Sequence, residues 1–445
     1  VASSLHNLAS SLSDQERYAD AEPLYRRSLA INEKAFGPDH PDVISSFANL
    51  AFSLIEQGKY AAAEPLYRRS LALQSNWLIR ELPLLPDQVR SGQLLQLGSS
   101  WEIPFGLINQ HPPLAEAALE TRLNRQGLLP EIEQRQALLI SAPSFERAKV
   151  EQLQFLTQQL ASVSLPSDRR TAVREQRDEL QSELYRKIPN LSIQLVNPAA
   201  VAKALPSDGA LVEFQRFHPF NSRKSTGQRW QPPLYIALIL KPDGSITPVP
   251  LGSAASIDAT IHKGLNSSAE GLVDAEAIWG QLSIQVFKPL LPHLKGSRQW
   301  FLSPDGELNR VPFAALPSPQ ERTTPLGQAV QLRLLTTGRE LLRLNQPSAS
   351  SSKNVVMANP SYDRLSAALT APVDTSLNMG QRRSTEVSSK KWEPLSGSER
   401  EGLLVAQLLN SQLISGPAAT TASLKRQQGP RVLHVATHGF FIAGQ

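Results

Sequence analysis

The sequence predicts an α + α/β fold, in which a helical amino-terminal part precedes a domain of alternating strands and helices. A block with a helical pattern occurs twice near the amino terminus, and helix-type spacing of apolar residues continues to about residue 190. After residue 195, β-type runs alternate with helical segments. We therefore expect repeats at 1–74, a helical linker at 75–195 and an α/β domain at 196–445.

The repeated block is YADAEPLYRRSLA at 18–30, which returns as YAAAEPLYRRSLA at 60–72, an offset of 42 residues. Apolar residues at helical spacing precede the second copy, Gly58 interrupts them, and Tyr60 resumes the pattern, which predicts helix, turn and helix. This unit resembles the tetratricopeptide repeat, in the long form found in kinesin light chains. The resemblance covers residues 1 to about 74.

Tetratricopeptide repeats bury their apolar faces against neighbouring repeats and usually need about three copies, so we expect further repeats before Val1. The resemblance implies a concave groove, lined by the first helix of each pair, that holds a partner protein or peptide. The 42-residue offset relates Asn7 to Asn49. The resemblance makes both candidates for binding a peptide backbone, and the alternative is a solvated asparagine on a helix surface.

The linker is rich in Leu, Gln, Glu and Arg at helical spacing, as in LAEAALETRLNRQGLLPEIEQRQALL and VREQRDELQSELYRKI. We interpret the charged stripes of these helices as solvated faces. The linker is expected to act as a platform that fixes the repeats relative to the domain that follows.

The α/β part begins with β-type runs and a turn, KPDGS at 241–245, that indicates a hairpin. The expected strands are 210–217, 234–240, 245–251, 354–363 and 431–437, and the expected helices are 275–294, 400–409 and 422–428. Because α/β sheets place active sites at the carboxyl ends of parallel strands, His438, one residue beyond the last strand, is a candidate catalytic base.

His434 and His438 have the HxxxH spacing of a possible metal pair. Pro430, the β-branched residues between them and Gly439 favour a strand, which would separate their α-carbons by roughly 13 Å, too far to share an ion easily. His434 is better explained as a buried or hydrogen-bonded strand residue. Ser303, in LSPDGEL, is explained better by a strand-ending turn than by a nucleophile.

Composition excludes several classes of function. The chain has no cysteine, so these residues supply no disulfide, no Cys-ligated zinc and no thiol nucleophile. The charge of +5 is spread along the chain rather than gathered as in nucleic-acid-binding proteins. No apolar run reaches the roughly 18 residues of a membrane span. We expect a cytoplasmic protein without a cofactor, metal, nucleic-acid partner or membrane association.

The blocks SPDGELNRVPFAAL, GRELLRL, VMANPSYD, PLSGSEREGLLVAQLL and RVLHVATHGFF follow one another between residues 303 and 441. Together they resemble the CHAT family, caspase-like domains found attached to tetratricopeptide repeats. The resemblance covers about 200–445 and implies a cysteine endopeptidase with a His-Cys dyad. It makes His438 the dyad histidine and the Gly439 N–H one oxyanion donor, with the cysteine on the next strand.

No cysteine follows His438, whereas in caspases the cysteine motif and the histidine lie roughly 50 residues apart. We therefore expect an incomplete caspase-like domain, inactive as given, within a piece of a longer peptidase that cleaves a protein substrate. The alternative is a non-catalytic scaffold that uses the repeats and a degenerate caspase-like domain to bind proteins.

Overall fold

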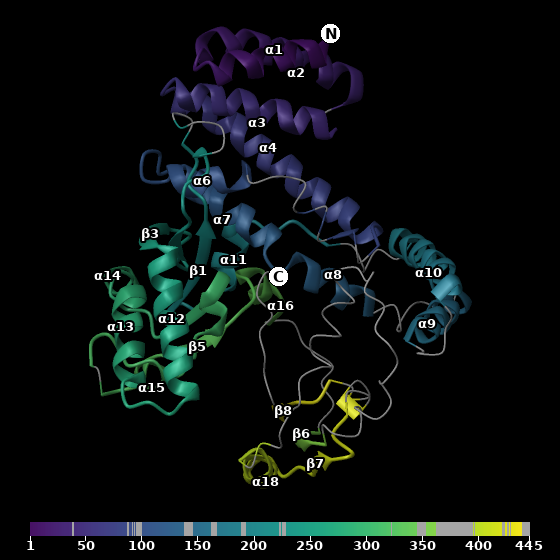
Figure 1. The fold of residues 1–445 in the computed structure, drawn as a ribbon, viewed down its shortest axis with the longest axis vertical. Helices are drawn as coiled ribbons and strands as arrows, with labels where there is room; N and C mark the ends of the chain where they lie inside the picture. Colours follow the sequence, from purple (N-terminus) through teal and green to yellow (C-terminus); the bar gives the residue numbers. More distant parts are fainter. Residues whose placement is uncertain are drawn as a thin grey trace. The chain divides into compact units, whose positions relative to one another are not determined.

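The computed structural model describes residues 1–37, 40–86, 89, 90, 92, 94, 100–137, 146–161, 167–187, 193–221, 224, 228–321, 323–344, 353–361, 395, 397–420, 423, 424, 427 and 429–437. They belong to two compact units, Val1–Asn345 and Gln346–Gln445 (Figure 1). Within the described ranges, no helix combines the length and apolar character that crossing a bilayer requires. Helices at the amino terminus and sheets after residue 208 confirm the predicted α + α/β class.

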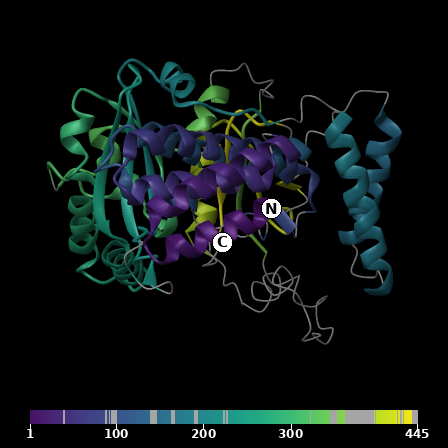
Figure 2. The same ribbon diagram turned by 90° about the horizontal axis from the view of Figure 1, so that it is seen from above.

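The amino-terminal repeats form two antiparallel helix pairs that run side by side (Figure 2). The helices are α1 (Ala2–Asp14), α2 (Tyr18–Phe36), α3 (Pro41–Glu56) and α4 (Tyr60–Glu81). The turn inside each pair needs a left-handed residue, which is Gly58 in the second pair (φ 74°) and Glu16 in the first (φ 60°). Because the conformation costs glycine little, the second turn is the less strained of the two.

The repeated block recurs because its residues make the same contacts in both copies. Ser28 Oγ donates to the carbonyl oxygen of Ala2 at 2.9 Å, and Ser70 Oγ donates to that of Ile44 at 2.9 Å. Both bonds tie the second helix of a pair to the first turn of its first helix. The apolar members of the block, with the small Ala21 and Ala63, are buried between the helices.

The repeats continue into a third helical layer made by α6 (Ile103–Leu107) and α7 (Leu114–Arg125). Glu22 of the first pair holds the next pair through Lys59 Nζ at 3.1 Å and Gln57 Nε2 at 3.2 Å. Its counterpart Glu64 holds the α6–α7 layer through His111 Nε2 at 3.0 Å. The helical layer after residue 100 therefore covers the second pair as another repeat would.

Helix α7 corrects the interpretation of the linker stripes as solvated faces. Nine of its residues are buried: Leu114, Ala115, Ala117, Ala118, Leu119, Thr121, Arg122, Leu123 and Asn124. One face packs with the repeats and the other with the first sheet. The charged side chain of Arg122 is therefore inside the protein. Helix α10 (Ser167–Lys187) pairs with α9 (Arg147–Ala161), and the two run side by side (Figure 2). The described side chains of α10 are mostly exposed or half-buried, as predicted.

The first unit contains a mixed five-stranded sheet with the order β3-β2-β1-β4-β5. Its strands are β1 (Gly209–Phe217), β2 (Leu234–Leu240), β3 (Ile246–Ser253), β4 (Gln299–Ser303) and β5 (Gln331–Leu334). The first three are antiparallel, with the predicted hairpin at 241–245, and β1, β4 and β5 are parallel.

Helices cover both faces of this sheet. One face packs against α12 (Ala254–Ala269) and α13 (Ala275–Phe287), and the other packs against α7 and α11 (Pro198–Ala204). Shorter helices complete the unit: α8 (Leu128–Ala137), α14 (Leu291–Leu294), α15 (Leu326–Ala329) and α16 (Leu341–Leu344). The sequence did not indicate α12 or the four-residue strand β5.

The second unit contains a separate three-stranded sheet with the order β7-β6-β8, all parallel. Its strands are β6 (Val355–Pro360), β7 (Leu413–Gly416) and β8 (Leu433–Ala436), and α18 (Ser398–Leu408) packs on it. The strands β6 and β8 and the helix α18 lie where the sequence predicted them. The strand β7 was not predicted.

The contact of Glu64 with the α6–α7 layer leads to a pH-dependent prediction. Burial raises the pKa of the Glu64 carboxyl. Hydrogen bonds from His111 and Arg68, together with their positive charges, lower the pKa by more than burial raises it, so it lies below its usual value. A lowered pKa contributes stability above the unfolded pKa, about 4.3, and that stability is lost as the pH falls through the folded pKa. Glu64→Gln should therefore cost about 1 kcal/mol at pH 7 and progressively less below pH 4.5.

Urea unfolding followed by circular dichroism measures this loss across the pH range. Glu133→Gln is the control, because Glu133 is an exposed carboxylate on α8. A loss for Glu64→Gln that stays the same at pH 7 and pH 4 would contradict the charged interaction.

Candidate functional site

The carboxyl edge of the second unit's sheet has the topology of a ligand site. The chain passes from β6 to β7 on one side and then to β8 on the other, so the strand order reverses between β6 and β8. In open α/β sheets, ligands bind outside the carboxyl ends of the strands at this reversal. The segments that follow β6 and β8 therefore form the best-placed site in this unit.

The segment that follows β6 is held by contacts to its neighbours. Asn359 adopts a left-handed conformation (φ 47°), its backbone N–H donates to Ser398 Oγ at 3.0 Å, and its Nδ2 donates to Glu399 Oε2 at 3.3 Å. The N–H of Ser361 donates to the carbonyl oxygen of Gly416 at 3.2 Å. These bonds fix the end of β6 to the start of α18 and the end of β7.

The other side of the site follows β8. The register pairs Ala358 of β6 with Ala436, the last residue of β8. The predicted base, His438, and the predicted oxyanion donor, Gly439, lie outside the described residues. The described structure therefore supplies the strand that leads to them and the neighbouring strand end.

His434 is a strand residue, as predicted. It lies on β8 opposite Val356, and its Nε2 is 3.1 Å from Oε1 of Glu401 on α18. This contact joins β8 to the helix when the imidazole is protonated. Among the described residues, no group of three or more His, Asp and Glu side chains is placed to hold a metal ion.

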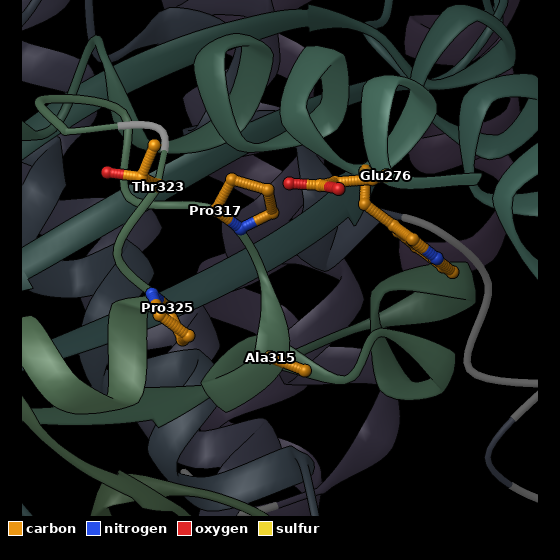
Figure 3. A pocket seen from close by; sticks show the side chains of 6 residues that line it. Glu276, Ala315, Pro317, Thr323 and Pro325 are labelled. Atoms are coloured by element: carbon orange, nitrogen blue, oxygen red, sulfur yellow. The ribbon is translucent and has the colours of Figure 1, made fainter. Parts of the chain in front are cut away.

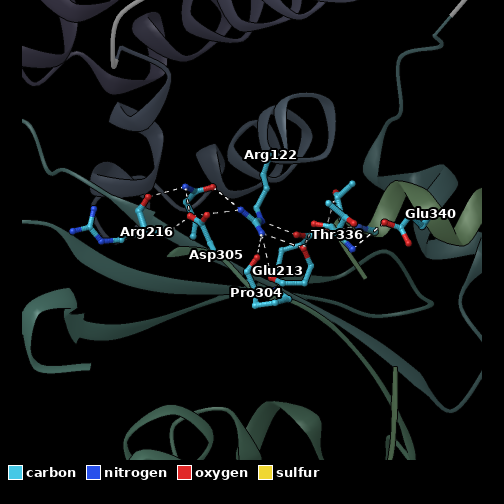
Figure 4. A network of polar contacts seen from close by, with 11 residues as sticks. Arg122, Glu213, Arg216, Pro304, Asp305, Thr336 and Glu340 are labelled. Atoms are coloured by element: carbon cyan, nitrogen blue, oxygen red, sulfur yellow. Dashed lines mark hydrogen bonds and ion pairs between the residues drawn. The ribbon is translucent and has the colours of Figure 1, made fainter. Parts of the chain in front are cut away.

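A second polar cluster lies at the carboxyl edge of the first sheet and centres on Arg122, which is fully buried (Figure 4). Its Nε donates to Glu213 Oε2 at 2.6 Å, and its Nη1 donates to Gln215 Oε1 at 2.9 Å. Its Nη2 donates to the Ser303 carbonyl and Oγ, both at 3.1 Å, and to the Pro304 carbonyl at 3.2 Å. One helix residue thus binds two parallel strands.

The remaining oxygen of Glu213 is also satisfied. Oε1 accepts a hydrogen bond from the Gly338 N–H at 2.6 Å and one from Thr337 Oγ1 at 3.2 Å. A Cβ at position 338 would meet Leu211 Cδ2, so any larger residue here would force the buried Leu211 side chain to shift. Glu213 is fully buried, and both of its oxygens therefore have partners within the protein.

Arg122 fills the first sheet's own reversal point. β1 continues into the hairpin on one side and β4 lies on the other, so the strand order reverses between β1 and β4. The guanidinium occupies this edge with its hydrogen bonds directed at protein atoms and no exposed surface. The Arg122 network, which we call the lock, holds β1 and β4 together. Its buried guanidinium is not placed to touch a substrate.

Ser303 belongs to this lock. It is the last residue of β4 and fully buried, and its Oγ donates to the Thr336 carbonyl at 2.9 Å. The strand-ending position that the sequence predicted is confirmed. Its hydroxyl serves the network and is not presented to solvent.

Arg122 and Glu213 were not predicted as functional or structural sites, although the sequence carries a signal for both. Arg122 follows Leu119 by three residues and Ala118 by four, so it lies on the apolar face of its helix. Glu213 stands between apolar residues in a strand that is buried on both faces. A charge in each of these positions indicates an internal ion pair.

Two cavities lie outside the strand reversal of the second sheet. One, of about 300 Å³, lies between α13 and the segment after β4 and is lined by Glu276, Trp279, Ala315, Pro317, Thr323 and Pro325 (Figure 3). The other, of about 380 Å³, has the buried Arg339–Glu131 ion pair among its lining residues. Neither contains a pair of groups arranged as nucleophile and base.

The predicted groove residues lie on adjoining first helices of the repeats. Asn7 on α1 is exposed, and Asn49 on α3 is half-buried with its Nδ2 3.2 Å from His6 Nε2. Burial lowers the pKa of His6 below its usual value, although the charge of Asp42 opposes this. The contact joins the first turns of α1 to the middle of α3.

The Arg122 lock leads to a stability prediction. Arg122→Met should lower the free energy of unfolding by about 3–5 kcal/mol, because it leaves the Glu213 carboxylate buried without its cation. The double variant Arg122→Met/Glu213→Gln should regain about 1–3 kcal/mol of this loss, because no uncompensated charge remains. Urea unfolding measures both values.

Arg298→Met is the matched control, because Arg298 pairs with Asp208 at 3.0 Å but is 85% exposed. Its loss should stay below about 1 kcal/mol. A loss for Arg122→Met as small as that of the control would show that the buried pair contributes little.

Comparison with known families identifies both parts of the chain. The CHAT domain matches residues 276–444, and the tetratricopeptide repeat matches residues 1–76. No curated protein matches the chain. The first match contains the whole second sheet with its β6–β8 edge, and the second contains α1 to α3 and most of α4. The chain therefore contains tetratricopeptide repeats at its amino terminus and a CHAT domain in its carboxyl-terminal part.

Proposed function

We propose that these residues are part of a caspase-like cysteine endopeptidase, and that its repeats recruit a partner or a protein substrate. The observation that supports the proposal is the strand reversal between β6 and β8 inside the CHAT match, because His438 follows β8 by two residues in the sequence. A base held at the carboxyl end of a parallel strand is well placed to act on a bound substrate.

In the proposed reaction, His438 is the general base. The neutral imidazole takes the proton of a cysteine thiol, and the thiolate attacks the carbonyl carbon of the scissile peptide bond. The imidazolium then returns the proton to the leaving amine nitrogen. The Gly439 N–H donates to the carbonyl oxygen as it becomes negative.

The thiol must come from outside these 445 residues, because they contain no cysteine. We therefore propose that residues 1–445 alone are inactive. What residues 1–445 contribute to the proposed reaction is the sheet whose strand β8 precedes His438 in the sequence. β8 pairs with β6 over four residues, and the end of β6 is in turn bonded to α18 and β7.

The repeats are proposed to bind a partner or peptide, with Asn7 and Asn49 donating and accepting hydrogen bonds to its backbone. Both side chains lie on first helices, and Asn7 is exposed. Tetratricopeptide repeats are protein-interaction modules, which supports this role.

The peptidase proposal predicts different behaviour for two neighbouring histidines. In a chain that continues beyond Gln445 and contains a cysteine, His438→Ala should lower casein cleavage by about 10²–10⁴-fold, because the general base is lost. His434→Gln is the matched control, because His434 contacts Glu401 on the face covered by α18. It should keep activity close to that of the unsubstituted chain.

Cysteine-to-alanine substitution in the same longer chain should abolish cleavage as well. Equal activity of His438→Ala and His434→Gln would refute the assigned base. If the continuing chain has no cysteine but still binds partners, the non-catalytic scaffold is favoured instead. The lack of cysteine in these 445 residues is compatible with that alternative.

The groove proposal predicts a loss of peptide binding. Asn49→Ala should weaken a peptide selected from a random display library by about fivefold, the value of one hydrogen bond of about 1 kcal/mol. Lys34→Ala, an exposed change on α2, serves as the control. Fluorescence anisotropy measures both affinities, and equal binding by the two variants would contradict a role for Asn49.

A further inference from the structure

We call the connection between β1 and β2, residues 218–231, the arm; the structure describes its residues 218–221, 224 and 228–231. Its two sides are joined by an antiparallel bridge between Phe220 and Trp230, whose rings lie 4.8 Å apart. The Asn221 N–H donates to the Arg229 carbonyl at 2.8 Å, and the Gln231 N–H donates to the Pro219 carbonyl at 2.8 Å. The base of the arm is thus a short hairpin.

This arm contacts the first helix of each repeat, and Figure 1 shows the chain beyond β1 reaching toward α3. The Phe220 ring meets the Phe52 ring of α3 edge to face, with centroids 5.2 Å apart. Arg229 Nη1 donates to Asp14 Oδ1 of α1 at 2.9 Å. An aromatic side chain and a cation from the sheet domain therefore bind the repeats.

The face that receives the arm is the one that carries Asn7 and Asn49. Asp14 follows Asn7 by seven residues, and Glu56 follows Asn49 by seven, which is nearly two helical turns and places each pair on one stripe. Phe52, one turn beyond Asn49, borders the second stripe. The arm therefore occupies the carboxyl-terminal end of the predicted groove.

This face is acidic. The sequences of α1 and α3 contain Asp14, Asp42 and Glu56 but no lysine or arginine. The arm has the opposite character, because residues 218–231, HPFNSRKSTGQRWQ, contain Arg223, Lys224 and Arg229 but no aspartate or glutamate. Complementary charge selects partners and disfavours wrong ones.

We infer that the α1–α3 face receives a basic, aromatic protein segment, and that the arm is its resident occupant. An incoming segment of the same chemistry displaces the arm from Asp14 and Phe52. The inference rests on the proposed partner-binding role of the repeats and specifies its ligand class. An added segment can bind only those molecules whose arm has left the α1–α3 face. Its apparent affinity is therefore reduced in proportion to the fraction of molecules in that open state.

The test uses the full chain and a fluorescein-labelled synthetic peptide with the sequence of residues 217–232, FHPFNSRKSTGQRWQP. Fluorescence anisotropy gives its affinity for the unsubstituted protein and three variants. Arg229→Glu removes the arm's ion pair, and Lys224→Glu makes the same charge change at an exposed arm residue. Asp14→Lys removes the acceptor on the repeats.

Arg229→Glu should bind the peptide about tenfold tighter than the unsubstituted chain, because its arm no longer competes. Lys224→Glu should bind like the unsubstituted chain. Asp14→Lys should bind at least about tenfold more weakly than Arg229→Glu, and a peptide with glutamate in place of the residue-229 arginine should regain affinity for it.

Peptide binding that is equal in the Arg229→Glu and unsubstituted chains would overturn the arm as an occupant. No binding by any of these proteins would overturn the basic, aromatic ligand class. Neither result would contradict the proposed peptide binding by the repeat groove, because that binding is measured separately with library-selected peptides and Asn49→Ala.

Discussion

The first unit depends on one buried ion pair, Arg122 with Glu213. Taking a guanidinium out of water is costly unless its donors find partners, and Arg122 finds them on β1, on β4 and in the segment after β4. Glu213 adds the turn after β5 through Gly338. Because an incomplete network leaves a charge unpaired, these elements are stable only together. Ala117, on the same helix as Arg122, packs with the repeats, so the lock also sets where they meet the sheet.

The two sheets use their carboxyl edges differently. In the first, the reversal between β1 and β4 is closed by an arginine of the same chain, which leaves no room for a reacting group. In the second, the reversal between β6 and β8 is bordered by Asn359, Ser361 and the approach to His438. We therefore assign the proposed peptidase chemistry to the second sheet.

The sequence predicted what is periodic or local. The repeats, the hairpin at 241–245 and the strands β1, β2 and β8 follow from spacing and turn residues, and the structure contains them. The lock could not be predicted by spacing alone, because Arg122 meets partners 91 and 181 residues away. A strand such as β5, with four residues and no fully buried side chain, carries no clear alternation. Nor does alternation reveal which strands share a sheet.

The lock and the arm share one strand, and this limits how far an arm movement can spread. The Arg216 N–H donates to Asp305 Oδ2 at 2.8 Å, and the buried Phe217 ring lies 5.9 Å from that of Phe105. Both contacts precede the arm, which begins at His218. β1 is therefore fixed up to Phe217, and the first residue of the arm is held as well, because the His218 N–H donates to Glu102 Oε2. A ligand that displaces the arm acts first on the repeats and the arm, while Glu213 and the centre of the sheet keep their contacts.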